Sequence, residues 1–153
     1  MKKFLFIYPL TLTLLFTIFY WDISPLANLI NQWQVNLSSL LTSFTLDDSA
    51  MQNNHILINS TLTLVIDKEC NGFIPYFFFL ASIIAFPSSI KHKIKWAVVG
   101  YVILSIFNVF RIWFITQLVM SSQKNFSLAH DYLGNIFLVV SAILLFITFI
   151  KTR

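Results

Sequence analysis

Charged residues are scarce in this sequence. They make up 10% of the 153 residues, and 58% of the residues are hydrophobic, whereas about 25% of the residues in a soluble domain are charged. This composition excludes an ordinary cytosolic protein, a disordered chain and a nucleic-acid-binding protein. Glycine and proline, with three and four residues, are too few for a low-complexity or fibrous chain.

Cysteine is also nearly absent, because Cys70 is the single one in the chain. One cysteine excludes a disulfide framework, a CxxC redox pair and a thiolate zinc cluster. We therefore expect neither a metal nor a cofactor. What remains is a small integral membrane protein with one domain over residues 1–153, for which the lipid bilayer is the surrounding partner.

Long apolar runs indicate where the chain crosses the bilayer. A hydrocarbon core of about 30 Å needs about 20 apolar residues as a helix. Four segments qualify, the second of them being short: residues 4–20, 73–87, 96–120 and 133–150. The sequence therefore predicts an all-α fold with four transmembrane helices. A lysine pair before an apolar run is also typical of a cleaved signal peptide, but this run is long for one and a poor cleavage site follows, so we expect an uncleaved anchor.

The charges alternate between the loops and predict the orientation. One side receives seven basic residues and no acid: Lys2, Lys3, Lys91, Lys93, Lys95, Lys151 and Arg153. The other side receives all six acids together with two lysines: Asp22, Asp47, Asp48, Asp67, Glu69, Asp131, Lys68 and Lys124. By the positive-inside rule both termini lie in the cytoplasm, and the protein is a multi-pass protein of the plasma membrane.

The segment 21–70 lies outside the membrane in this scheme and is too long for a plain connector. Apolar residues recur at three- and four-residue spacing from Leu26 to Phe44, which predicts an amphipathic helix that either lies on the membrane surface or covers the other helices. Alternating apolar residues around Asn59-Ser60 predict a small β-hairpin. The hairpin leads directly to Cys70.

Three polar side chains are predicted to meet near the outer membrane surface. Cys70 precedes the second span, Arg111 lies inside the third, and His130 precedes the fourth. Taken singly, a cysteine is more often a packing residue, and a histidine at an interface is more often solvated, as we expect for His55 and His92. Arg111 is different, because an arginine within a span costs about 2.5–3.5 kcal/mol and usually has a partner or a task. Asn108, one turn earlier, indicates a polar pocket.

These residue types fit acyl-transfer chemistry. A fixed cation beside a thiol favours the thiolate, and a guanidinium can also bind the oxyanion of a tetrahedral intermediate. An imidazole can take the thiol proton and later protonate a leaving amine. The hypothesis from the residues alone is a Cys-His enzyme assisted by Arg111.

The same residues resemble the motifs of the exosortase and archaeosortase family. Three stretches carry the likeness, which covers residues 65–150: Glu69-Cys70-Asn71-Gly72, Asn108-Val109-Phe110-Arg111-Ile112 and Ala129-His130-Asp131-Tyr132-Leu133-Gly134. The Cys-Asn-Gly form and the Ala85-Phe86-Pro87 that follows are most similar to the exosortase H subtype. Many family members are longer and have about eight helices, so substrate docking here is expected to differ.

The resemblance implies a membrane cysteine transpeptidase whose site faces the extracytoplasmic side. Its partners would be membrane-anchored exported proteins with a C-terminal sorting signal, consisting of a short motif, a transmembrane helix and a basic cluster. The acyl group would pass to a lipid or another acceptor. Cys70 would be the nucleophile, Arg111 the stabiliser of the oxyanion or thiolate, and His130 the acid and base, with Asn71 and Asn108 as supporting hydrogen-bond groups.

Other functions remain open or are disfavoured by the residues. A non-catalytic accessory subunit that binds a membrane partner is the main alternative, and it would pair Arg111 with an acid such as Glu69 or Asp67. A quinone-linked thiol oxidoreductase needs a second cysteine. A rhomboid protease needs a Gly-x-Ser-x-Gly-like motif, and an aspartyl membrane protease needs two acids within the spans. A channel is disfavoured because only one strongly polar face is evident.

Overall fold

The computed structural model describes residues 2–21, 25–47, 49–122 and 128–153 of the chain. Three charged residues used for the orientation, Asp22, Asp48 and Lys124, lie outside the described residues, as does the side chain of Asp131.

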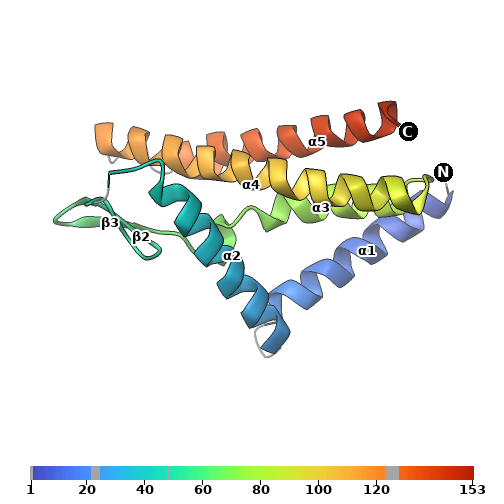
Figure 1. Ribbon diagram of the computed structural model, residues 1–153, viewed down its shortest axis with the longest axis horizontal. Coiled ribbons are helices and arrows are strands. Elements are labelled where there is room, and N and C mark those ends of the chain that lie inside the picture. The colour runs from blue at the N-terminus through green and yellow to red at the C-terminus, as the bar shows by residue number, and fades with distance from the viewer. Residues whose placement is uncertain (1, 22–24, 48, 123–127) are drawn as a thin grey trace.

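The chain is mostly helical, and its long helices run along the long axis of the molecule, with the N- and C-terminal ends at the same end (Figure 1). The helices and helical turns are α1 (Lys2–Tyr20), α2 (Pro25–Ser43), η1 (Lys68–Cys70), α3 (Phe73–Ala85), α4 (Ile90–Ser121), η3 (Leu128–Gly134) and α5 (Asn135–Lys151). Within the described residues, three segments are long and apolar enough to cross a membrane: Lys2–Tyr20, Ile90–Ser121 and Tyr132–Lys151.

The second predicted span, residues 73–87, corresponds to the shorter apolar helix α3. Its 13 residues span about 20 Å at 1.5 Å per residue, less than a bilayer core. The helix ends where Phe86 adopts an extended conformation before Pro87, and it begins after Gly72, whose φ of +79° is left-handed. α3 nevertheless packs against α1, α4 and α5, so it lies at the centre of the helical bundle.

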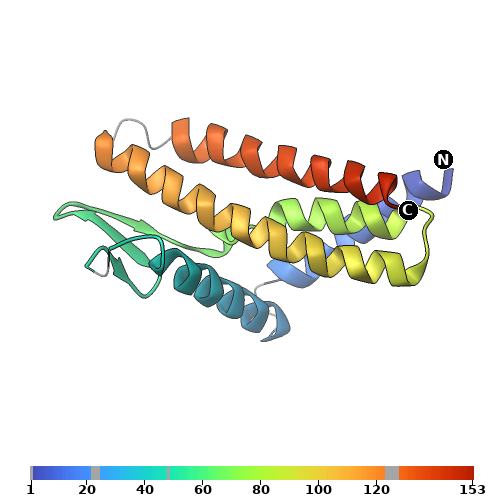
Figure 2. The ribbon, with the colours of Figure 1, turned by 45° about the horizontal axis from the view of Figure 1, so that its top comes forward.

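A small antiparallel sheet lies at the end of the molecule away from the chain termini (Figure 2). It contains β1 (Met51–Gln52), β2 (His55–Asn59) and β3 (Leu62–Val65), in that order. The hairpin predicted around Asn59-Ser60 is therefore confirmed as β2 and β3. The fold is therefore not purely α-helical. Besides the predicted hairpin, the sheet contains a third strand, β1, which the sequence does not predict because two residues are too few to show alternation.

Helix α2 forms as its periodicity predicts, but its polar side faces the protein. The buried residues are Ala27 and five polar ones: Asn31, Gln34, Ser38, Ser39 and Thr42. Leu26, Leu29 and Trp33 are more than half exposed. Burial of the polar side is tolerated because some of its groups have partners: the Asn31 amide donates to the carbonyl of Phe19, for example, at 3.0 Å. The helix covers its neighbours with this polar stripe, while Ile30 packs on the contact between α1 and α3 and several other apolar residues stay exposed.

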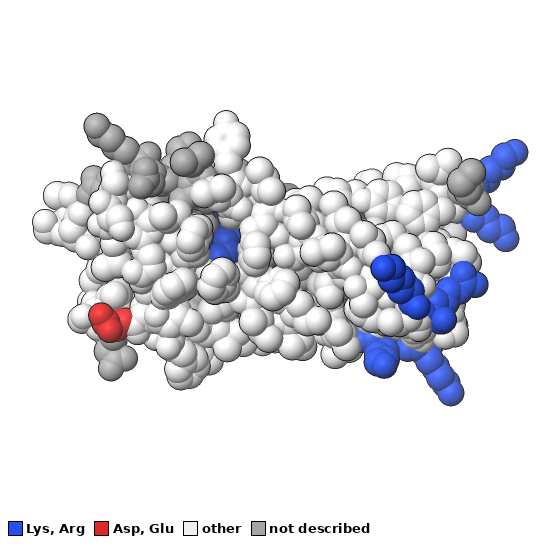
Figure 3. Space-filling model, turned by 90° about the horizontal axis from the view of Figure 1, so that it is seen from above, with Lys and Arg blue, Asp and Glu red and all other residues white. Residues whose placement is uncertain are grey.

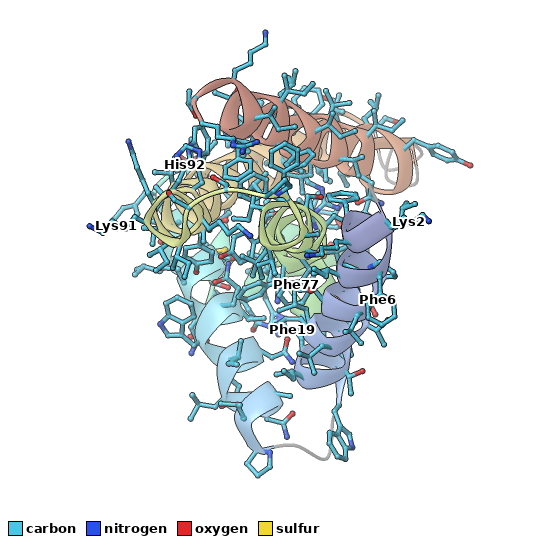
Figure 4. All side chains as sticks on the ribbon, turned by 90° about the vertical axis from the view of Figure 1, so that its right-hand side faces the viewer. Lys2, Phe6, Phe19, Phe77, Lys91 and His92 are labelled. Carbon is cyan, nitrogen blue, oxygen red and sulfur yellow. The ribbon has the colours of Figure 1, made fainter. Side chains whose placement is uncertain are left out.

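Aromatic side chains fill the contact between α1 and α3. Phe19 and Phe77 point toward each other from these two helices (Figure 4), with ring centroids 5.1 Å apart. Phe6, by contrast, points away from the bundle. An apolar exterior of this kind is expected where lipid surrounds the helices, because the bilayer does not force apolar side chains inward.

The charged residues separate along the long axis. On the face seen in Figure 3, most of the lysine and arginine side chains lie at the end that carries the chain termini, a further basic patch lies near the middle, and an acidic patch lies toward the opposite end. Lys91 and Lys2 project outward at the basic end (Figure 4). This separation follows the alternation of charge between loops that the sequence shows.

Candidate active site

Cys70 ends a single helical turn placed between the sheet and helix α3. Asp67 caps this turn, since its carboxylate accepts the backbone N–H of Lys68 at 2.6 Å, and its carbonyl accepts the N–H of Cys70 at 2.8 Å. The turn therefore holds the Cys70 backbone in one orientation. The side chain of Cys70 is half-buried and forms no disulfide.

His130 meets the thiol from the other side of the site. Its Nε2 lies 3.5 Å from the Cys70 Sγ, although the two residues are 60 positions apart in the chain. His130 belongs to the π-helical segment Leu128–Gly134, which precedes α5. Wide helical turns of this type are frequent at functional sites, because they change the direction of one or two side chains. The distance is within reach for proton transfer between sulfur and nitrogen.

Arg111 is buried within helix α4, with 4% of its surface exposed. Its Nη2 donates to the Asn135 Oδ1 at 3.1 Å, and its Nη1 lies 3.4 Å from the Asn108 Oδ1. Its Nε has no hydrogen-bond partner among the described residues. Two neutral amides thus position the guanidinium, and in the described part of the chain it has no carboxylate partner. A buried cation without a counter-ion is costly, which is typical of a site that awaits a negative charge.

Asn108 connects Arg111 to the cysteine. Its Nδ2 donates to the carbonyl of Cys70 at 2.8 Å, and its Oδ1 accepts a hydrogen bond from the guanidinium of Arg111. Gly72 permits this close approach. A Cβ at that position would lie 3.0 Å from the Asn108 Cβ, and the left-handed φ would also strain any other residue. The Cys-Asn-Gly sequence is therefore explained locally by a tight backbone turn against Asn108.

The environment of Cys70 lowers the pKa of its thiol. Burial is the largest single influence and raises the pKa. It is outweighed by the hydrogen bond to His130, the backbone hydrogen bond at Asp67 and the charges of His130 and Arg111, all of which lower the pKa. The net direction is downward, so a larger fraction of Cys70 is thiolate at neutral pH than in a free cysteine.

A cavity of about 280 Å³ opens beside these groups. Cys70, Arg111 and His130 all line it. The rest of its wall is mostly apolar and comes from the sheet and helix α4: Ile56, Leu62, Thr63, Leu64, Val65, Ile66, Ile112, Ile115 and Thr116. The thiol, the guanidinium and the imidazole thus share one concave site, as the sequence predicts.

Further polar groups support the site from behind. Asn71 is 1% exposed, and its Oδ1 caps α3 by accepting the N–H of Phe73 at 3.0 Å. Gln34 on α2 donates to the carbonyl of Asn71 at 3.0 Å and accepts the hydroxyl of Tyr101 on α4. Gln34 therefore connects α2 to α4 and to residues 67–72, the cysteine loop, which contains Cys70 and Asn71.

Gln34 and Asn135 were not among the site residues predicted from the sequence. Asn135 is a polar residue at the start of an apolar run, five positions after His130, and this position was the available signal. Gln34 had no such signal, because it is one of several amides on the polar side of α2.

His92 corrects an expectation. It is not merely solvated, because its Nε2 lies 3.2 Å from the carbonyl of Phe149, and its ring lies beside that of Phe149 with centroids 4.8 Å apart. It connects α4 to α5 at the basic end of the molecule (Figure 4). His55 is exposed, as expected. No three His, Cys, Asp or Glu residues come together as a metal-binding group within the described residues.

The comparison with protein families gives a match along most of the chain. The model described as Transmembrane exosortase (Exosortase_EpsH) matches residues 2–147. The chain belongs to the transmembrane exosortase family. The family predicted from the Cys70, Arg111 and His130 motifs is therefore confirmed, and the match extends into the N-terminal half, before the motif-like stretches begin. No curated protein and no solved structure matches the chain.

Membership in the exosortase family agrees with the several apolar helices, and the protein is a multi-pass membrane protein. At the level of the family, exosortases are transpeptidase-type enzymes that act on exported proteins with sorting signals. Of the residues in the three motif-like stretches, Cys70, Arg111 and His130 line the cavity, and Asn108 bonds to both Cys70 and Arg111. This geometry is the starting point for assigning their roles.

Proposed function

We propose that this exosortase is a cysteine transpeptidase or peptidase that cleaves the C-terminal sorting signals of membrane-anchored exported proteins. Cys70 acts as the nucleophile, His130 as the acid and base, and Arg111 as the stabiliser of negative charge. The site operates at the extracytoplasmic side of the plasma membrane. Asn71 and Asn108 position these groups.

The contact of 3.5 Å between the Cys70 Sγ and the His130 Nε2 is the observation that carries this proposal. A nucleophile and its base must lie within hydrogen-bond reach, and such contacts are often loose before substrate binds. The lowered pKa of the Cys70 thiol supports the same assignment, because the thiolate is the attacking form.

The proposed reaction proceeds through a thioester. His130 takes the proton of the Cys70 thiol, and the thiolate attacks the carbonyl carbon of the scissile peptide bond. Arg111 donates hydrogen bonds to the oxyanion that forms. His130 then protonates the leaving amine, the C–N bond breaks, and the acyl group stays on Cys70. An acceptor nucleophile, a lipid or another group, loses its proton to His130 and displaces the sulfur.

The membrane contributes proximity. The anchor helix of a substrate diffuses within the same bilayer, and its basic tail stays on the cytoplasmic side by the positive-inside rule. The peptide segment just outside the membrane then reaches the depth of Cys70. Because both molecules are confined to the bilayer, part of the translational entropy cost of bringing enzyme and substrate together is already met before they bind.

If the protein were a non-catalytic accessory subunit, we would expect Arg111 to form a structural ion pair with Glu69 or Asp67. The described residues instead give the guanidinium the side-chain oxygens of Asn108 and Asn135. A cation held by neutral groups keeps its charge available for an incoming oxyanion, whereas an ion pair would cancel it. This difference favours the enzyme.

The first test is co-expression with exported proteins that carry a C-terminal motif, a transmembrane helix and a basic cluster. We expect the wild type to release the C-terminal piece of a true substrate, observed as a loss of mass, and C70A and C70S to abolish the release. Membrane insertion of both variants should be unchanged, because Cys70 precedes the apolar helix. Processing retained in C70A would exclude the nucleophile role.

A second test separates the charge of Arg111 from its shape. Lysine keeps the charge but lacks the planar fork that reaches Asn108 and Asn135. We expect R111K to lower processing by about a hundredfold, the usual cost of removing one oxyanion donor. The measurement is the initial rate of product formation at equal protein levels. Near-normal processing would show that the charge alone suffices.

A further inference from the structure

The edge of the small sheet borders the active-site cavity. Strand β3 is the last strand in the order β1-β2-β3, and no described strand pairs with its other edge. It ends at Val65, five residues before Cys70. The strand therefore leads from the end of the molecule away from the chain termini toward the helical turn that carries Cys70, as Figure 2 shows.

The register of the sheet determines which backbone groups are free. The N–H of Ile66 donates to the carbonyl of Asn54 at 2.8 Å, toward β2. Opposite Thr63 stands Leu57, whose N–H is directed away from β3 and donates to the carbonyl of Ala50 at 2.7 Å. Because backbone groups alternate in an antiparallel ladder, Leu64 also faces β2, whereas the N–H and C=O groups of Thr63 and Val65 face the open edge.

The cavity lining supports this orientation. The side chains of Leu62 and Leu64 pack on Ile115 and Val119 of α4. Thr63 and Val65, which point to the other face, also line the cavity. Successive side chains of a strand point to opposite faces, so residues of both kinds reach one cavity along the edge of the strand.

We propose that this edge binds the substrate: an extended segment of the sorting-signal peptide, N-terminal to the scissile bond, adds to β3 as a fourth strand. This inference rests on the proposed function and names how the site recognises its peptide. Backbone hydrogen bonds to Thr63 and Val65 hold the peptide, and its C-terminal end delivers the scissile carbonyl to Cys70 beside Arg111. Addition of a strand to a free edge is a recurring mode of peptide recognition.

The direction of the bound peptide follows from its anchoring. A substrate chain passes from its exported part toward its membrane helix, and β3 runs from the outer end toward the start of α3. The two chains therefore pair in parallel. Alternate side chains of the peptide face the apolar wall formed by Ile112 and Ile115, while backbone contacts are independent of sequence.

The test uses peptides that react with the thiol and need no known recognition motif. Acetyl-Ala-Ala-Ala-Ala-chloromethyl ketone and acetyl-Ala-chloromethyl ketone carry the same reactive group, which forms a C–S bond with the Cys70 thiolate and releases chloride. The longer peptide can pair with β3 and the shorter one cannot. We expect the purified wild-type protein to react about tenfold faster with the longer peptide, the effect of one or two hydrogen bonds.

The variant V65P removes one edge-facing N–H without touching the ladder to β2, a position at which an edge strand tolerates proline. We expect V65P to bring the ratio of the two rates, long peptide to short peptide, close to one. The matched control V65A keeps the N–H and should keep the ratio. A V65P protein that retains the tenfold ratio overturns the proposal.

N-methylated peptides test the pairing on the wild-type protein, whatever the stability of V65P. Methylation of the tetrapeptide at alternate amides should slow labelling to the rate of the short peptide, and methylation at the intervening amides should not. Equal rates for long and short peptides, or equal effects of methylation at every position, overturn the strand pairing and leave Cys70 as the nucleophile. Failure of every peptide to label Cys70 overturns the proposed function, and the inference with it.

Discussion

At the scale of single residues, Cys70 should respond to pH differently from a free cysteine, whose pKa is about 8.5. Its hydrogen bond to His130 and the nearby positive charges lower the pKa of the thiol more than burial raises it. We expect the rate of alkylation by iodoacetamide to rise with pH around a midpoint below the ordinary value.

Removal of the imidazole should reverse part of this effect. H130A should move the midpoint upward and slow alkylation at pH 7 several-fold, because the hydrogen bond and the charge that favour the thiolate are both lost. Mass spectrometry of the modified protein measures the rate. H92A is the matched control, since it removes an imidazole that contacts the carbonyl of Phe149 and does not line the cavity of Cys70. An unchanged midpoint in H130A would contradict the role of His130 as the base.

Much of the site could be predicted at this scale because polar residues are rare in apolar helices. Arg111 and Asn108 were conspicuous within the third apolar run, and Cys70 is the single cysteine. The structure brings Cys70, Arg111 and His130 to one cavity, although their catalytic roles stay predictions. Gln34 could not be found in this way, because only the packing of α2 distinguishes it from the exposed amides of the same helix.

At the scale of elements, helix α2 shows why a periodic pattern leaves the inner face undetermined. The spacing from Leu26 to Phe44 predicts a helix with two faces, and α2 is that helix. In water the apolar face must turn inward, but beside a bilayer either face can do so. The sheet was predicted in the part where alternation is long enough. β1 was missed because its two residues are too few to show alternation.

The inward polar side of α2 can be tested with two glutamines of the same helix. Gln34 is 2% exposed and bonded to Asn71 and Tyr101, whereas Gln32 is exposed. We expect Q34A to lower the free energy of unfolding by about 1–3 kcal/mol, because it leaves buried polar groups without partners. Q32A should have almost no effect. Thermal unfolding in detergent compares the two variants, and equal stabilities would show that α2 does not hold the cysteine loop.

At the scale of the whole molecule, charge and chemistry lie along one axis. Most of the basic side chains visible in Figure 3 lie at the end with the chain termini, and Cys70 lies between the helical bundle and the sheet. The length of α3 is part of this arrangement. The helix begins only at Phe73, and α2 packs against the helical turn Lys68–Cys70 that precedes it.

The orientation of this axis gives the last prediction, which the single cysteine makes simple. If the positive-inside rule holds, Lys91 faces the cytoplasm and Cys70 the outside. A membrane-impermeant maleimide applied to intact spheroplasts should label wild-type protein at Cys70. The double variant C70A/K91C should be labelled only after the membrane is permeabilised, and C70A alone should not be labelled in either condition. Labelling of C70A/K91C in intact spheroplasts, together with wild-type Cys70 labelled only after permeabilisation, would invert the topology. It would place the thiol on the side from which an exported substrate cannot reach it, so the proposed function would fail together with the orientation.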